Sequence, residues 1–139
     1  MNGIRDALNV AGHPKKALPV IETEYGISNG ADAFDRLMTA DLSPTLVICG
    51  NDVLAAGALR RAQERGLSVP KDISITGFDD IELASLVTPR LTTVHVPHRA
   101  MGEAAAEALI AMSEESWSGN SLCLPTDIQM GETLTAPKP

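Results

Sequence analysis

Two adjacent carboxylates, Asp79 and Asp80, follow a short apolar run that ends in Gly77-Phe78. A pair of this kind could share acid–base catalysis, hold a metal ion, cap a helix or accept hydrogen bonds from a small molecule. Because neighbouring side chains diverge in any regular backbone, joint acid–base work by the two residues is disfavoured. Two interpretations stay open for Asp79 and Asp80: contact with a bound small molecule, or an ordinary turn and helix start.

Tyr25 and Asn51 also directly follow runs that are predicted as strands, PVIET and TLVICG. Together with the Asp79 carboxylate they make a suitable set for a polyol. The carboxylate accepts from hydroxyl groups, the amide fixes the orientation, and the aromatic ring covers the C–H face of a sugar. Each has a structural alternative, since Tyr25 could simply cover the edge of the core and Asn51 could serve only as a helix N-cap.

Enzyme chemistry finds little support in the sequence. It contains no phosphate-binding GxxxxGK[ST] loop, no GxGxxG after a strand and no GxSxG. A receiver-type phosphate acceptor needs a lysine at the end of a strand, whereas Lys71 precedes its strand. The sequence therefore predicts a protein that is not an enzyme, with no catalytic residues and no cofactor.

The cysteines and histidines do not form a metal-binding pattern. Cys49 and Cys123 lie in apolar runs, which predicts buried thiols that act as small apolar side chains. The histidines show no ligand spacing, and we expect no metal site; they are His13, His95 and His98.

Helical and extended patterns alternate along the chain. The predicted helices cover 2–11, 28–38 (with Ser28 as N-cap), 51–65 and 99–113, and the predicted strands cover 19–23, 45–50, 72–76, 91–95 and 122–130. This alternation predicts an α/β domain with three layers (αβα) and a mostly parallel sheet, in which ligands bind beyond the carboxyl ends of the strands. The continuous apolar run 45–50 predicts a strand covered on both faces. One set of side chains on the last predicted helix is expected to face inward: Met101, Ala104, Ala105, Ala108, Leu109 and Met112.

Length, composition and charge limit the possible partners. The chain has 139 residues, 44% of them apolar, which fits one compact domain. With 11 basic and 18 acidic side chains, its net charge of −7 argues against DNA binding by this chain alone. No run has the length of a membrane span or a signal peptide, so we expect a soluble cytoplasmic protein without membrane contact.

The stretch from Pro44 to Ile110 closely resembles the lactose/galactose-repressor (LacI/GalR) family of bacterial transcription regulators. The resemblance depends on several motifs in order, namely TLVIC with Asn51-Asp52, GLSVP from Gly66, GFDD from Gly77, PRLTTV from Pro89, and Met101-Gly102. It implies a periplasmic-binding-protein-like (type I) C-terminal subdomain, with residues 1–139 as a single effector-binding and dimerisation unit.

The resemblance also implies roles for single residues. Asp79 matches the family's effector-binding aspartate, Asn51 a position that hydrogen-bonds sugar in some members, and Tyr25 the aromatic residue that stacks on the ligand. His98 falls where the family often places a cleft residue, on the crossover after LTTV. The implied ligand is a small effector such as a sugar.

The sequence departs from the family pattern in what it lacks. The DNA-reading headpiece, the hinge helix, the N-terminal subdomain and its effector-clamping arginine have no counterpart, and Gly131 replaces a usual arginine. The first strand of the subdomain is also missing; in the family it lies between the strands that match 19–23 and 45–50. The helical segment 98–116 would pack on the absent subdomain. We therefore expect a truncated subdomain that forms a homodimer through its exposed sheet and binds effector weakly by itself.

The predicted function is the effector-sensing and dimerising part of a LacI-type repressor that contacts DNA only through a headpiece absent from this chain. Two alternatives remain open at this point, a periplasmic-type sugar-binding module and a receiver-like phosphate-accepting domain.

Overall fold

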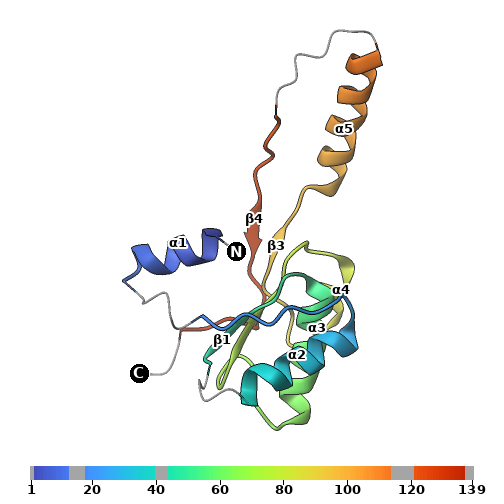
Figure 1. Ribbon diagram of the computed structural model, residues 1–139. Coiled ribbons are helices and arrows are strands. Elements are labelled where there is room, and N and C mark those ends of the chain that lie inside the picture. The colour runs from blue at the N-terminus through green and yellow to red at the C-terminus, as the bar shows by residue number, and fades with distance from the viewer. Residues whose placement is uncertain (1, 13–17, 40–43, 114–120, 137–139) are drawn as a thin grey trace.

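The computed structural model describes residues 2–12, 18–39, 44–113 and 121–136, and Figure 1 shows their arrangement. In order, the helices and strands are α1 (Asn2–Val10), α2 (Ile27–Thr39), β1 (Leu46–Ile48), α3 (Asp52–Glu64), β2 (Ser74–Thr76), α4 (Glu82–Leu86), β3 (Thr93–His95), α5 (His98–Ser113) and β4 (Asp127–Gln129). Helices and strands alternate from α2 onward, whereas no strand separates α1 from α2.

The sheet is built around β2. Strand β1 pairs with it in parallel, with Val47 opposite Ile75. On the other side of β2, parallel bridges join Thr76 to Thr92 and Asp79 to His95, so that β3 continues in the same direction. Strand β4 returns antiparallel to β3. The carboxyl ends of β1, β2 and β3 therefore lie at the same edge of the sheet.

Helices α2 and α3 cover one face of this sheet and form the core with it. The fully or almost fully buried apolar side chains come from both helices, from β1 and β2, and from the segments around them: Phe34, Val47, Ala55, Ala58, Leu59, Ala62, Ile73, Ile75, Ala84 and Leu91. Two glycines let the helices approach closely. A Cβ on Gly30 would collide with the Leu54 carbonyl, and one on Gly57 with the Ile27 carbonyl.

The opposite face of β1 is open. Successive side chains of a strand point to opposite faces, so Val47 enters the core while Leu46 and Ile48 turn away from it, with 41% and 47% of their surfaces exposed. The prediction that run 45–50 is covered on both faces is thus wrong, because no described helix packs over these two side chains.

The predicted strand 19–23 is also absent. These residues form no strand, and Val20 is 44% exposed. A strand exists only through hydrogen bonds to a neighbour, and no described strand lies beside this segment. Helix α2, by contrast, is present but begins one residue before Ser28, with the Gly30 amide donating to the Gly26 carbonyl.

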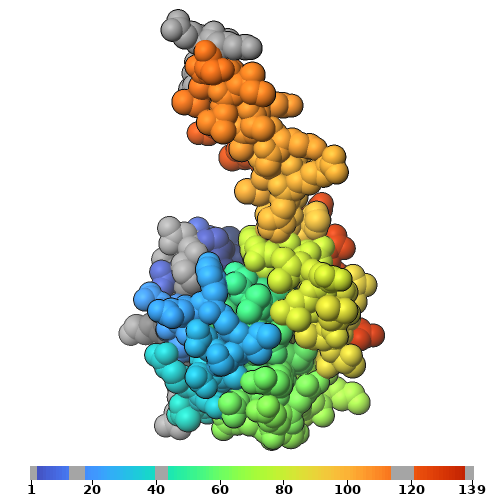
Figure 2. Space-filling view, turned by 90° about the vertical axis from the view of Figure 1, so that its right-hand side faces the viewer, coloured from blue at the N-terminus to red at the C-terminus, as the bar shows by residue number. Residues whose placement is uncertain are grey.

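Helix α5 and the returning segment 121–126 project from the body as an arm (Figures 1 and 2). None of the α5 side chains is buried, so the expected inward face, including Met101 and Leu109, is wrong for this chain. Residues 114–116 of the predicted packing segment lie outside the described residues. Cys123 on the returning segment is exposed, which corrects its expected burial.

The segment that follows β4 is anchored to the body. Thr133 is fully buried, its Oγ1 accepts from the Thr92 amide at 2.9 Å, and its carbonyl accepts from the Ile75 amide at 2.9 Å.

Candidate functional site

The candidate site lies at the edge where the parallel strands end. The loop after β1 contains Asn51, and the loop after β2 contains Asp79. Backbone hydrogen bonds join the two loops, since the Cys49 amide donates to the Thr76 carbonyl and the Asp52 amide donates to the Phe78 carbonyl, at 2.8 and 2.9 Å. The structure thus brings the segments of Asn51 and Asp79 together, as expected for residues that follow neighbouring parallel strands.

Asn51 is the N-cap of α3. Its backbone is extended, and its Oδ1 accepts from the Leu54 amide at 2.8 Å. The cap interpretation is therefore confirmed for this oxygen. The Nδ2 group takes no part in this cap bond, and 9% of the residue surface is exposed.

Asp79 and Asp80 occupy a backbone region that is uncommon for residues with a side chain. Their φ angles are 103° and 56°. The Asp79 amide donates to the Val94 carbonyl at 3.0 Å, which attaches the turn to β3. Oδ2 of Asp80 lies 2.8 Å from Nδ1 of His95. The two carboxylates thus have separate surroundings, because Asp80 faces His95 while no polar partner is described for the Asp79 carboxylate.

Tyr25 and His98 lie at the starts of two other helices. Tyr25 precedes α2, whose first turn packs beside the start of α3 through Gly30 and Leu54. Its side chain is 79% exposed. His98 is the first residue of α5 and is also exposed. No described hydrogen bond joins either ring to Asn51 or Asp79, so a common site for all four residues stays a prediction.

Asp52 is a site residue that the sequence interpretation missed. It is the acidic residue in the first turn of α3, and it is fully buried. Its Oδ2 accepts from the Ile81 amide at 2.9 Å and its Oδ1 from the Thr93 hydroxyl at 2.5 Å. A Cβ on Gly77 would collide with Oδ1. The glycine before Phe78 was the available signal, since it indicates a close approach to the strand end.

Electrostatics at this edge affect the thiol of Cys49. Burial and the neighbouring Asp52 carboxylate raise the pKa of Cys49 to about 12. Cys49 is half-buried behind the loop and remains a neutral thiol at physiological pH. Among the described residues, no group of three or more His, Cys, Asp or Glu side chains is placed to hold a metal ion.

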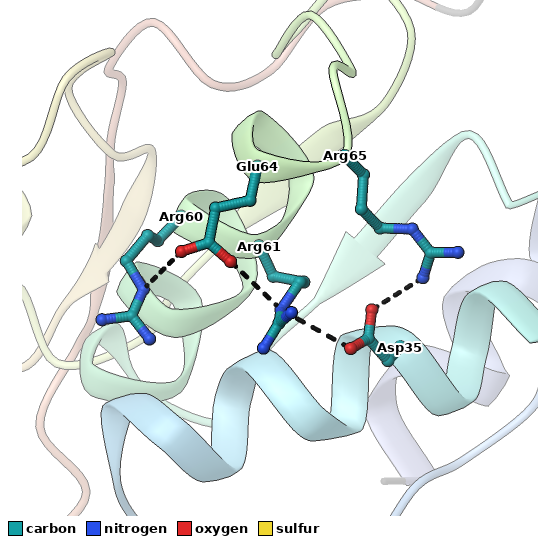
Figure 3. Close-up of polar contacts among 5 residues, drawn as sticks. All are labelled: Asp35, Arg60, Arg61, Glu64 and Arg65. Atoms are coloured by element: carbon teal, nitrogen blue, oxygen red, sulfur yellow. Dashed lines mark hydrogen bonds and ion pairs between the residues drawn. The ribbon is translucent and has the colours of Figure 1, made fainter.

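A separate charged cluster joins α2 to α3 farther along the helices (Figure 3). Asp35 lies 2.7 Å from Arg65 and 3.5 Å from Arg61, and Glu64 lies 3.4 Å from both Arg60 and Arg61. These side chains are about one-third to one-half exposed, and Arg61 Nε is buried with ion-pair contacts but without a hydrogen bond among the described residues. Their arrangement supports helix packing rather than ligand binding.

Comparison with known proteins assigns the chain to a family. A family model described as a periplasmic binding protein-like domain matches residues 1–134. The chain belongs to this family. This membership confirms the α/β, periplasmic-binding-protein-like fold class.

Curated relatives of the chain include proteins named as transcriptional repressors. The PurR repressor of Vibrio atlanticus (strain LGP32) is 39% identical over 110 residues, which cover 79% of this chain and 33% of the relative. Catabolite control protein A of Priestia megaterium is 33% identical over 134 residues, which cover 96% and 40%. The resemblance to the LacI/GalR effector-binding region is thereby confirmed, and neither relative is named as an enzyme. The chain spans 33–40% of the length of these two relatives.

Solved structures of LacI-type regulators share the fold. A LacI family regulator from Enterococcus faecium with bound ribose aligns with a TM-score of 0.85 at 29% identity, over 99% of this chain and 50% of that one. A dimeric Lac repressor aligns with a TM-score of 0.88 at 27% identity, over 99% and 50%. A complex of the regulator CelR with cellobiose aligns with a TM-score of 0.87 at 28% identity, over 94% and 40%.

Proposed function

We propose that this chain is the effector-sensing and dimerising part of a LacI-type repressor, and that it binds a small sugar or a related molecule at the sheet edge. Tyr25, Asn51, Asp79 and His98 form the ligand-binding side of that edge. The observation that carries the proposal is the pair of hydrogen-bonded loops that bring Asn51 and Asp79 to one edge. Solved relatives in complex with ribose and cellobiose support a sugar as the class of ligand.

The proposed division of labour follows from groups at the edge. The Asp79 carboxylate accepts hydrogen bonds from sugar hydroxyls, and Nδ2 of Asn51 donates one. The exposed ring of Tyr25 offers an apolar face to the C–H side of the sugar. His98, at the first position of α5, contacts the ligand from the side of the arm.

DNA contact belongs to a part of the repressor outside these residues. With a net charge of −7, the present chain has no electrostatic attraction for a phosphate backbone. The effector changes operator affinity indirectly, because it biases the closure of two subdomains and so moves the DNA-reading part. The proposed repressor acts in the cytoplasm. As a separate finding, none of the described helices combines the length and apolar character that crossing a bilayer requires.

The arm belongs, in this proposal, to the interface with the second subdomain. Helix α5 and the returning segment 121–126 line an open groove of about 690 Å³. Its walls are apolar or small side chains such as Met101, Ala108 and Leu122. In the longer repressor, the second subdomain fills this groove and supplies the other wall of the effector site.

The dimer forms through the open side of the sheet. Leu46 and Ile48 expose apolar surface there, and the backbone groups of both residues point away from β2, because the flanking Thr45 and Cys49 make the bonds to β2. An unpaired strand edge with apolar side chains favours association with another chain. The likeness to a dimeric Lac repressor supports self-association.

A nuclear magnetic resonance titration tests the ligand site directly. D-ribose added to the ¹⁵N-labelled chain should shift the amides of Asn51 and Asp79 in fast exchange, with a weak affinity because only one wall of the site is present. Asp79→Asn should reduce the shifts at least several-fold, since the amide cannot replace both accepting oxygens. Asp6→Asn, at an exposed position of α1, serves as the matched control and should leave them unchanged. If ribose and cellobiose produce no shifts at this edge, or shifts only elsewhere, the proposal is wrong.

A further inference from the structure

The carboxylate of Asp52 connects three segments that would otherwise be independent. Its own backbone belongs to the first turn of α3, directly after Asn51. Oδ2 accepts from the Ile81 amide at 2.9 Å, in the turn after Asp79 and Asp80. Oδ1 accepts from the Thr93 hydroxyl at 2.5 Å, at the first residue of β3. One buried side chain thus joins both ligand-site loops to the strand that leads to the arm.

The Asp52 carboxylate is enclosed by protein on all sides and has no contact with solvent. Asp52 is 0% exposed, and Gly77 packs against Oδ1 so closely that no side chain fits there. A buried carboxylate is tolerated only when hydrogen bonds replace its water. Its position in the first turn of α3 also lets the helix dipole stabilise negative charge. The two hydrogen bonds therefore stabilise the buried Asp52 carboxylate as well as the segments that it joins.

The turn that Asp52 holds is strained. Asp79 and Asp80 have φ angles of 103° and 56°, a region that residues with a side chain rarely adopt. Such conformations persist only where surrounding contacts fix them. The Asp52 contacts enclose the turn from both sides, because its amide donates to the Phe78 carbonyl at 2.9 Å and its carboxylate binds the Ile81 amide.

From these contacts we infer that Asp52 is the positioning residue of the site, which holds Asp79 in its strained conformation and couples that conformation to β3 through Thr93. The inference rests on the proposed function only for the meaning of Asp79 as a ligand contact. A ligand that moves Asp79 also displaces the Ile81 amide and changes its hydrogen bond to the Asp52 carboxylate. Because that carboxylate also binds Thr93, the change reaches β3 at the base of the arm.

Amide hydrogen exchange of the 139-residue chain tests the inference without any ligand. The deciding signal is the Asp79 amide, which donates to Val94 and does not touch Asp52. In Asp52→Ala, its protection should fall about tenfold or more, as expected when a hydrogen bond to a charged group is lost. The Ile75 amide, which donates to Thr133 in the core, should stay within about twofold of the wild type after correction for the change in global stability.

Two further variants keep the test informative if Asp52→Ala does not fold. Asp52→Asn retains one oxygen for the Ile81 amide and can donate to the Thr93 oxygen, so it should restore most of the protection. Thr93→Val keeps the shape of the threonine but removes its hydroxyl, and it should lower protection at Asp79 as well. Phe34→Leu, in the core away from the edge, is the control for general destabilisation and should lower protection at Asp79 and Ile75 together.

The inference is overturned if Asp79 keeps wild-type protection in Asp52→Ala and Thr93→Val, or if Asp79 and Ile75 lose protection by the same factor in these variants. A ribose titration of the same samples then separates this outcome from the proposed function. Failure of ribose to bind the wild-type chain would count against the sugar proposal and would leave the exchange result intact. Ribose binding that is preserved in Asp52→Asn and weakened in Thr93→Val would support both the inference and the proposed function.

Discussion

At the level of single residues, local geometry divides the work among neighbouring polar side chains. Asn51 caps α3 with its Oδ1, and its Nδ2 is the atom that we propose donates to the ligand. Asp80 faces His95, whereas Asp79 remains available. Asp52 is buried and serves the turn. Residue type alone would not separate three aspartates, because their roles depend on the direction in which each side chain leaves the backbone.

The two cysteines should differ strongly in reactivity. Cys123 is exposed, whereas burial and Asp52 raise the pKa of Cys49 to about 12. Since the thiolate is the reactive form, iodoacetamide at pH 8 should modify Cys123 rapidly and Cys49 only after unfolding. Cys123→Ser should leave no fast-reacting thiol in the folded chain. Rapid modification of Cys49 in this variant would contradict its assigned surroundings.

The same shift makes stability depend on alkaline pH. Unfolded Cys49 ionises near a pKa of about 8.5, while the folded thiol holds its proton to about pH 12. Below about pH 8.5 the contribution is fully present, and it is lost as the pH rises through this window. The free energy of unfolding from urea titrations should therefore fall between pH 8.5 and 10 less steeply in Cys49→Ala than in the wild type. Equal slopes would argue against the shift.

At the level of elements, the contact of α2 with α3 determines where the site loops begin. Gly30 and Gly57 allow the helix backbones to touch. The cluster around Asp35 adds charge pairing at the far end of the same contact, at a gain of no more than about 1 kcal/mol for exposed pairs. The position of Tyr25 relative to Asn51 depends on this packing.

Gly57→Ala should therefore destabilise the chain although alanine favours helices. The new Cβ meets the Ile27 carbonyl, and the expected loss is about 1–3 kcal/mol, as for other overpacked sites. Gly102→Ala in α5 is the matched control, because nothing lies within 4 Å of its added Cβ. It should stabilise by about 0.5–1 kcal/mol. Thermal unfolding followed by circular dichroism measures both, and a stabilising Gly57→Ala would refute the close contact.

At the level of the whole molecule, two apolar surfaces lack cover, the open face of β1 and the arm. They differ in the partner that we propose for each. We propose that the open face of β1 contacts a second copy of the chain, whereas the groove of the arm contacts the second subdomain. Charge substitutions on each surface distinguish the two.

The wild-type chain should sediment as a homodimer at micromolar concentrations. Ile48→Lys places a charge on the open face of β1 and should shift the equilibrium towards the monomer by about tenfold or more, because an apolar contact is replaced by a charge that must lose water. Leu109→Lys on the exposed side of α5 should leave the dimer intact. A monomeric wild type at all concentrations would contradict self-association, and dissociation by Leu109→Lys alone would place the contact on the arm.

Much of the architecture was accessible from the sequence. The periodic apolar pattern predicted the four longer helices and most strands but not the short helix α4, and it offered Asn51 as an N-cap. It also gave the common edge of Asn51 and Asp79, because parallel strands end together. The motifs GFDD and PRLTTV identified the family that the comparisons confirm.

The tertiary structure decided what depends on a partner in space. Segment 19–23 has the composition of a strand, yet it lacks a neighbour and stays irregular. Run 45–50 looks fully buried, yet one side of it has no cover. Asp52 reads as an ordinary first-turn acid, yet it holds the strained turn of Asp79. The physical reason is the same in each case, since composition sets what a segment favours, while hydrogen-bond partners and burial come from residues distant in the chain.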